Sequence, residues 1–270
     1  MSIGACVGAT IMLVITGAAE PVAEIGSRPA LVATDLPATT TTRAPVDLGG
    51  QTGGATVGAL VIDRTTGRTV LADGADGSFH SQSLVKLLIA VDALERGTGT
   101  PSQITKMLSA SDDGVASALW SQGGGGAIVT RWTRRLGLTG TAPPSEPGRW
   151  GQTKITATDV ARIYRYLTDE APPAHRDIVL TALRAAPRVA ADGFDQHFGI
   201  PSAAAGLGWA VKQGWACCLP TRDLHTTGLV GPDDRYVVVL LTAHPRGVPW
   251  NTAAATATRL AENVLAPIRG

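Results

Sequence analysis

Residues 78–94 read SFHSQSLVKLLIAVDAL, and this stretch decides our prediction of the fold. Ser83 and Lys86 stand three residues apart at the start of an apolar run that has the length of a helix. Residues i and i+3 share one face of a helix, so Lys86 can reach back toward Ser83. Lysine is scarce in this chain and occurs at positions 86, 106, 154 and 212 alone. A lysine at the start of a helix that is otherwise apolar therefore calls for an explanation.

Two interpretations of this pair are open. A serine hydroxyl becomes a nucleophile when a base accepts its proton, and a desolvated lysine with a lowered pKa can be that base. A serine in the first helical turn also lies at the positive end of the helix dipole, which favours developing negative charge. In the other interpretation, Ser83 belongs to the helix N-terminus and Lys86 is a solvated surface charge. Ser-x-x-Lys alone does not decide between them.

The composition excludes several classes of protein. The chain has 270 residues, 44% hydrophobic and 17% charged, which is enough for one large domain with a real core. Its formal net charge of +1 gives no basic patch for nucleic acid. The histidines are scattered at positions 80, 175, 197, 225 and 244, without the spacing of a metal site. We therefore expect no nucleic-acid partner, no metal and no cofactor.

The N-terminal residues predict export. Residues 3–19 are apolar and uncharged and end in small residues, as in the hydrophobic part of a signal peptide. The usual basic residues before such a segment are missing, so an uncleaved membrane anchor is the alternative. The stretch IGAC at 3–6 resembles a lipobox only faintly, because the apolar run follows Cys6, and we do not predict a lipoprotein. Residues 1–19 are thus a predicted signal peptide or anchor, which places the protein in an extracellular, periplasmic or cell-wall-associated location.

The remaining chain divides into a linker and one globular domain. Residues 20–54 are poor in core residues and rich in Thr, Pro and Gly, which predicts an extended linker. In the domain at 55–270, two strands come first, helical patterns fill a lobe at about 81–205, and three strands and a helix follow. That order predicts one sheet assembled from both ends of the chain, with the helical lobe inserted between its parts.

Two tripeptides follow the serine–lysine pair in the sequence. SDD at 111–113 stands at a predicted helix turn, and KQG at 212–214 lies in a predicted strand. Ser-x-x-Lys, Ser-Asp-Asn and Lys-Thr-Gly in this order are typical of class A β-lactamases and penicillin-binding proteins. Residues 55–268 resemble this superfamily of serine hydrolases. The resemblance implies an α/β (α+β) fold of the β-lactamase/transpeptidase type, with an antiparallel sheet flanked by helices, a reduced helical lobe and an active site between them.

The resemblance also implies a role for each residue at a matching position. Ser83 would be the acylated nucleophile, and Lys86 would assist its deprotonation. Ser111 would relay a proton to the leaving nitrogen, and Lys212 would supply positive charge for a substrate carboxylate. The backbone N–H groups of Ser83 and Trp215 would form the oxyanion hole.

The sequence departs from the superfamily at the second and third motifs. Gly214 is kept, which lets a substrate approach the strand closely. Gln213 replaces a hydroxyl residue that helps to hold the substrate carboxylate, and we expect its longer amide to crowd the pocket. Asp113 replaces an asparagine that donates to the substrate. An ionised carboxylate cannot donate, and it would hold Lys86 in its charged form. The alternative is that Asp113 is a simple helix N-terminal acid.

Glu146 is the candidate for a further role. It is the only acid in the stretch LGLTGTAPPSEPGRWGQTK at 136–154. The resemblance implies that a glutamate there activates water for deacylation, as in class A β-lactamases. The alternative is an ordinary surface acid, in which case a β-lactam would acylate Ser83 and remain attached. Cys217 and Cys218 are adjacent and would have no other partner once Cys6 is removed, so they are joined to each other or are free thiols.

These observations predict an exported serine hydrolase that forms an acyl-enzyme at Ser83. Its substrate would be a small-molecule β-lactam or a D-alanyl peptide of the cell wall. We expect a monomer, with a possible membrane tether through the N-terminus. The alternative from another class is a non-catalytic module on the same fold that binds cell wall or a partner protein. An esterase on the same scaffold is a third reading.

Overall fold

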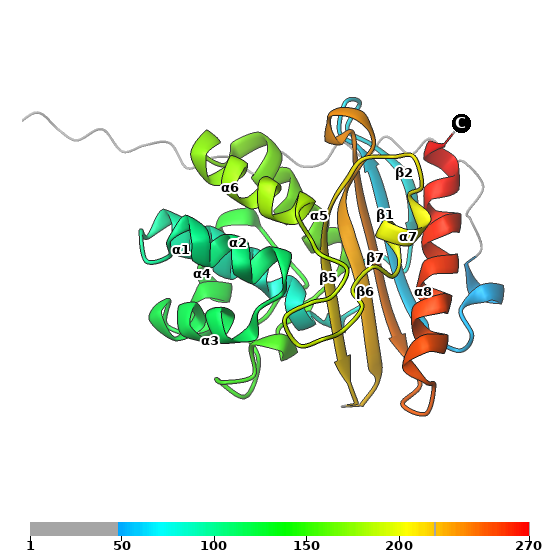
Figure 1. The fold of residues 1–270 in the computed structure, drawn as a ribbon, viewed down its shortest axis with the longest axis horizontal. Coiled ribbons are helices and arrows are strands. Elements are labelled where there is room, and N and C mark those ends of the chain that lie inside the picture. The colour runs from blue at the N-terminus through cyan, green and yellow to red at the C-terminus, as the bar shows by residue number, and fades with distance from the viewer. Residues whose placement is uncertain (1–47, 219, 270) are drawn as a thin grey trace, which may run out of the picture. The chain divides into compact units, whose positions relative to one another are not determined.

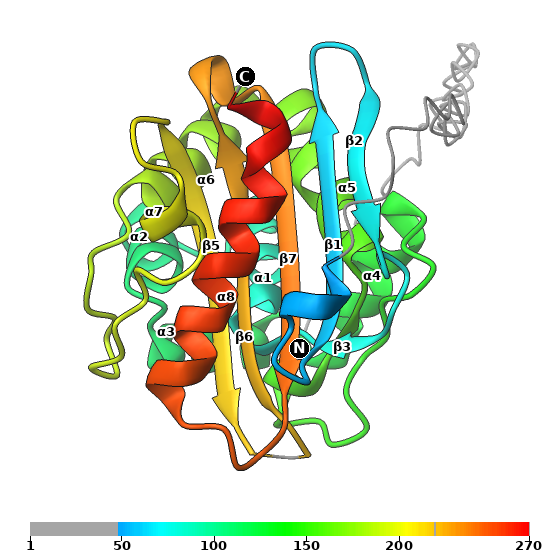
Figure 2. The same ribbon diagram turned by 90° about the vertical axis from the view of Figure 1, so that its right-hand side faces the viewer.

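The computed structural model describes residues 48–218 and 220–269. The predicted signal peptide or anchor, and most of the predicted linker, lie outside these residues. The described chain forms an antiparallel sheet with helices on both faces (Figures 1 and 2). Its five strands lie in the order β2-β1-β7-β6-β5. Their bounds are β1 (Thr56–Asp63), β2 (Arg68–Asp73), β5 (Trp209–Cys217), β6 (Arg222–Val230) and β7 (Tyr236–His244).

The sheet is assembled from both ends of the chain, which confirms the predicted fold class. β1 pairs with β7 from Thr56 opposite Ala243 to Asp63 opposite Tyr236. β2 pairs only with β1, and β5 only with β6, so these two are the edge strands. The edge formed by β5 therefore has unpaired backbone groups available to a substrate or to the helices beside it.

β7 is apolar on both faces because both faces of the sheet are covered. Val237, Val239 and Leu241 belong to the hydrophobic cluster shared with the helical lobe. Val238 and Leu240 belong to a second cluster, beneath α8 (Trp250–Leu265). Figure 2 shows α8 crossing this second face. Alternate strand residues point to opposite faces, so two covered faces require a continuous apolar run.

The helical lobe lies on the face opposite α8 (Figure 1). Some of its helices begin or end at capping residues. The side chain of Thr100 accepts a hydrogen bond from the backbone N–H of Gln103, and Gly137 ends its helix in the left-handed conformation. The bounds are α1 (Lys86–Glu95), α2 (Pro101–Ser109), α3 (Asp113–Gln122), α4 (Gly126–Leu136), α5 (Ala157–Arg165) and α6 (Pro173–Arg184).

The structure contains short elements that the sequence did not predict. β3 (Phe79–His80) pairs with β4 (Lys154–Ile155), and α7 (Ile200–Ala203) precedes β5. Elements of two to four residues are too short to show a periodic pattern. Leu48, before the predicted start of the domain, is buried in the cluster beneath α8. Among the described helices, none combines the length and the apolar character needed to span a bilayer.

Candidate active site

The four residues that the motifs single out form one connected chain of contacts, in which the two lysines share the Ser111 hydroxyl. The Nζ atom of Lys86 lies 3.0 Å from the Oγ atom of Ser83 and 3.0 Å from that of Ser111. The Nζ atom of Lys212 also lies 3.0 Å from the Oγ of Ser111. Three separate parts of the chain, namely the start of α1, the turn before α3 and the edge strand β5, therefore supply one connected set of polar groups.

Local backbone geometry presents both serines to this cluster. Ser83 lies in a 3-10 turn, Gln82–Val85, which leads directly into α1. Gln82 and Ser111 have φ angles of 47° and 56°, a region that L-residues other than Asn, Asp and His seldom adopt. Such strain persists only where surrounding contacts impose it, and it gathers at functional sites. Gln82 is held by a hydrogen bond of 2.7 Å from its side-chain amide to Asp223.

Both lysines are buried, which is costly for a charged group. Lys86 has none of its surface exposed and Lys212 has 1%. Burial lowers the pKa of Lys86, and the carboxylate of Asp113 partly offsets that effect. Burial and the neighbouring Lys86 together lower the pKa of Lys212 well below its ordinary value. Two buried amines of this kind are a feature of chemical sites more than of structural cores.

Asp113 connects the buried cluster to solvent. Its Oδ1 atom lies 2.6 Å from the Nζ of Lys86, and 66% of its side chain is exposed. The first residue of α3 is Asp113, one position after Asp112, whose side chain accepts the N–H of Val115 as the helix cap. Asp112 is thus the helix-capping acid, whereas Asp113 faces the lysine.

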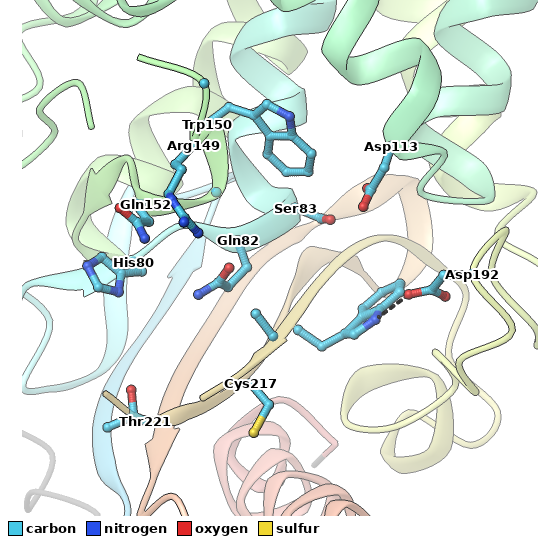
Figure 3. A pocket seen from close by; sticks show the side chains of 14 residues that line it. His80, Gln82, Ser83, Asp113, Arg149, Trp150, Gln152, Asp192, Cys217 and Thr221 are labelled. Atoms are coloured by element: carbon cyan, nitrogen blue, oxygen red, sulfur yellow. Dashed lines mark hydrogen bonds between the residues drawn. The ribbon is translucent and has the colours of Figure 1, made fainter. Parts of the chain in front are cut away.

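A cavity of about 360 Å³ opens over Ser83. Figure 3 shows the Ser83 hydroxyl pointing toward the Asp113 carboxylate, with Trp150 nearby. His80, Gln82 and Arg149 lie on the other side of the serine. The remaining lining residues are Gly148, Gly151, Gln152, Asp192, Trp215, Ala216, Cys217 and Thr221. The lining combines aromatic surface with a few charged and polar groups, as small-molecule sites do.

Gln213 does not crowd this cavity, contrary to our expectation. It is 1% exposed, and its side-chain amide donates to the backbone carbonyls of Gln196 and Phe198 at 2.9 and 2.7 Å. Successive residues of a strand point to opposite faces, so when Lys212 faces Ser111, Gln213 must face the other way. Its amide therefore holds the segment before β5 and does not contact the space above Ser83.

Gly214 and Trp215 lie where β5 passes the nucleophile turn. A Cβ atom on Gly214 would meet the carbonyl oxygen of Ser81 at 3.2 Å and the side chain of Leu84 at 3.4 Å. Glycine therefore allows the strand to approach the turn that carries Ser83. The indole of Trp215 donates to Asp192 at 2.9 Å and stacks on Phe194, so its side chain forms one wall of the cavity.

Glu146 is not brought together with the other predicted residues. Its carboxylate pairs with Arg149 at 2.6 Å, and both side chains are more than half exposed. Glu146 is absent from the described residues that line the cavity, whereas Arg149 is present among them. The geometry is that of the alternative we left open, an ordinary surface acid.

Sequence reasoning missed Trp150 and Asp192 as parts of the site. The ring centre of Trp150 lies 4.9 Å from the Nζ of Lys86, a distance at which the aromatic face attracts a cation. The indole N–H of Trp150 donates to Ser117. Neither residue lies in a motif, and their proximity to Ser83 depends on loops whose path is not periodic.

At the end of β5, Cys217 and Cys218 are joined as a disulfide, and Cys217 lines the cavity.

Comparisons with solved structures agree with this architecture. A variant of an ancestral class A β-lactamase, bound to a transition-state analogue, aligns with a TM-score of 0.68 and 18% identity, over 84% of this chain and 100% of that one. PBP-A, in an acyl-enzyme complex with penicillin G, aligns with a TM-score of 0.64 and 18% identity, over 81% and 92%. A class A β-lactamase from Bacteroides cellulosilyticus aligns with a TM-score of 0.65 and 13% identity, over 80% of this chain and 92% of that one. At these identities, the likeness shows the fold.

Comparison with known sequences identifies closer relatives. No family model matches the chain. Proteins named "Putative lipoprotein LppW" from Mycobacterium tuberculosis and Mycobacterium bovis are 38% identical to it over 218 residues, which cover 76% of this chain and 68% of theirs. The chain therefore belongs to the LppW family, and it has the fold of class A β-lactamases and PBP-A.

Proposed function

We propose that the protein is an exported serine hydrolase of the penicillin-binding type, acylated at Ser83 by β-lactams and by D-alanyl peptides of the cell wall. One observation carries the proposal. Ser83, Lys86, Ser111 and Lys212 form a connected set of contacts of 3.0 Å, and Ser83 lines a cavity of about 360 Å³. A structural core has no need of two buried amines beside two hydroxyls, whereas acyl transfer to serine needs these groups.

The cavity offers what an acyl acceptor requires. The hydroxyl of Ser83 attacks a carbonyl carbon, and the amines beside it accept and transfer the proton that it releases. The backbone N–H groups of Ser83 and Trp215 stabilise the oxyanion, because the strand and the nucleophile turn approach closely at Gly214. The free edge of β5 pairs with an extended peptide, as exposed sheet edges do in peptide recognition.

Release of the acyl group is expected to be slow. Hydrolysis of an acyl-serine needs a base that activates water. The carboxylates that line the cavity are Asp113 and Asp192. Asp113 is paired with Lys86, and Asp192 accepts the indole N–H of Trp215. With both carboxylates engaged in this way and Glu146 on the surface, a bound penicillin persists as an adduct.

The relatives support an exported location with a membrane tether. The related mycobacterial proteins carry the name of a lipoprotein. Residues 1–19 have the apolar character of an export signal or an anchor. The proposed substrate is a cell-wall peptide, and an enzyme that acts on it must lie outside the cytoplasmic membrane.

Incubation of the protein with a fluorescent penicillin tests the proposal. We expect a covalent adduct that persists for hours, and peptide mass spectrometry should place it on Ser83. An adduct on another residue would contradict the assignment of the nucleophile. Rapid loss of the β-lactam without an adduct would identify a β-lactamase instead. A protein that binds muropeptide but is never acylated would be the non-catalytic module, which the pairing of Asp113 with Lys86 favours as the second candidate.

Replacing Glu146 with glutamine should leave both acylation and release unchanged. The carboxylate pairs with Arg149 at the surface and has no contact with the cluster at Ser83. Deacylation half-lives measured by loss of fluorescence from the labelled protein should agree within twofold between wild type and variant. Arg149→Gln, which removes the partner that lines the cavity, is the matched comparison. A severalfold slower release by Glu146→Gln alone would restore Glu146 to a catalytic role.

A further inference from the structure

We propose that Lys212, acting through the Ser111 hydroxyl, is the terminal proton acceptor during acylation of Ser83, and that Lys86, charged before and after the step, positions Ser83 and relays its proton. The inference rests on the proposed acylation of Ser83 and assigns the groups that carry its proton. It follows from an asymmetry between the two buried amines, which share one hydroxyl but differ in their remaining contacts.

The two amines differ in how many partners they have that can only accept a hydrogen bond. Lys86 lies 2.6 Å from a carboxylate oxygen of Asp113 and 2.7 Å from the carbonyl oxygen of Ser111. Carboxylate and carbonyl oxygens can only accept, so two of the Lys86 protons point at them. Lys212 has one such partner, the carbonyl oxygen of the next residue, Gln213, at 2.8 Å. In the described chain, no carboxylate forms an ion pair with Lys212, and it is 1% exposed.

Hydrogen-bond directions at Ser111 also distinguish the amines. Its hydroxyl has one proton to donate and is 5% exposed. Within residues 48–218 and 220–269, the polar partners of that hydroxyl are the two amines, each at 3.0 Å. If both were ammonium groups, both would donate to the same oxygen, and the hydroxyl proton would point at a cation. A neutral amine at Lys212 accepts that proton and resolves the conflict.

Electrostatics select Lys212 as the neutral member. A buried ammonium is tolerated when a carboxylate pairs with it, and Asp113 pairs with Lys86. The charged groups that face Lys212 are Lys86 from α1, Asp113 from α3 and Asp192 from the loop before β5. Burial and the Lys86 charge lower the pKa of Lys212, and the two more distant carboxylates only partly oppose this. The phenol of Tyr164, whose pKa burial raises, stays neutral and adds no charge.

The resulting proton path balances. The Ser111 proton passes to the neutral amine of Lys212 as the Lys86 ammonium gives one of its own protons to Ser111 Oγ. Lys86, now briefly neutral, accepts the proton that Ser83 Oγ loses as this oxygen bonds to the substrate carbonyl carbon. When the carbon–nitrogen bond breaks, Lys212 returns the proton through Ser111 to the leaving nitrogen. Lys86 is an ammonium before and after the step, so its ion pair with Asp113 is present in both states.

A first experiment reads the protonation states without any need for activity. The full chain, labelled with ¹⁵N and ¹³C at lysine, gives four side-chain signals. Lys106→Arg and Lys154→Arg assign the two lysines outside the site and serve as controls. We expect one remaining signal, from Lys212, to titrate to the neutral amine at a lower pH than the signal from Lys86. Asp113→Asn should shift the titration of Lys86 downward more than that of Lys212. Titration of Lys86 first, or of neither below pH 10, would overturn the inference.

A second experiment measures acylation. Lys212→Arg replaces an amine that can accept a proton with a guanidinium that cannot. We expect it to lower the first-order acylation constant by about 10²–10⁴-fold, the range for loss of a general base, with little change in the half-saturating penicillin concentration. Asp113→Asn in the Lys212→Arg background should restore acylation at least tenfold, because Lys86 without its carboxylate can become the base.

The two readouts separate the possible failures. If Lys212 only anchors a substrate carboxylate, Lys212→Arg will keep the acylation constant, and Asp113→Asn will rescue nothing. Those results would overturn the inference and leave the proposed function intact. If the wild-type protein is never acylated, the proposed function fails, and the lysine titrations still decide which amine is neutral. Thermal melting of each variant confirms that a lost rate is not lost folding.

Discussion

Ser83→Ala is expected to abolish covalent labelling by penicillin while leaving the fold in place. The hydroxyl is the only part of Ser83 that bonds to an acyl group, and loss of a serine nucleophile costs on the order of 10⁶ in rate in a serine protease. The hydroxyl's partner is the Nζ of Lys86, so its removal should change the free energy of unfolding by only about 1 kcal/mol. Gel fluorescence and intact-protein mass spectrometry measure the labelling.

Ser78→Ala is the matched control for that variant. Ser78 is exposed and lies five residues before Ser83 in the same segment of the chain. It should label at the wild-type rate. Persistent labelling of Ser83→Ala, at any residue in the cavity, would place the nucleophile elsewhere and remove the basis of the proposed chemistry.

Asp92→Ala is expected to cause the largest loss of stability among the substitutions considered. Asp92 is 3% exposed and lies on α1, the helix that begins with Lys86. Its carboxylate accepts two hydrogen bonds from Arg131, at 2.9 and 2.8 Å, and one from the indole of Trp132 at 3.2 Å. Alanine leaves these donors without their partner. Breaking such a pair costs about 3 kcal/mol, which corresponds to a fall in Tm of roughly 6–12 °C.

Thermal and urea unfolding, followed by circular dichroism, measure this effect. Glu262→Ala provides the control, because Glu262 is a helical acid on the exposed side of α8. It should stay within about 0.5 kcal/mol of wild type. An Asp92→Ala protein as stable as Glu262→Ala would mean that the Arg131 pair contributes nothing to joining α1 and α4.

The sequence was sufficient for the fold, and the four groups that it singled out lie together in the structure. Amphipathic helices have a periodic pattern, β7 is a continuous apolar run, and the motifs selected Ser83, Lys86, Ser111 and Lys212. These are local signals. The β3–β4 pair joins positions 79–80 to 154–155 and depends on the path of an irregular loop, so no local sequence pattern predicts it.

The side-chain directions were harder to predict than the positions. Gln213 occupies a motif position, yet strand alternation turns its amide toward the carbonyls of Gln196 and Phe198. That outcome could have been derived from the two-residue period of a strand, given that Lys212 faces inward. Glu146 was predicted because it is the only acid in its stretch. That reasoning carries no information about where its side chain points. Trp150 and Asp192 reach the cavity from loops, whose residues follow no periodic pattern that would predict which side chains point inward.

The pairing of β1 with β7 has a consequence for biogenesis. Thr56 lies opposite Ala243, so β1, which pairs with the adjacent β2 on one side, gains its other neighbour only after residues 236–244 have been synthesised. Contacts that close so large a loop form slowly, and an early strand that waits for its neighbour exposes apolar surface to chaperones and proteases. The hairpin of β1 and β2 is therefore expected to form early, and the five-stranded sheet that carries Lys212 only when the C-terminal strands are available.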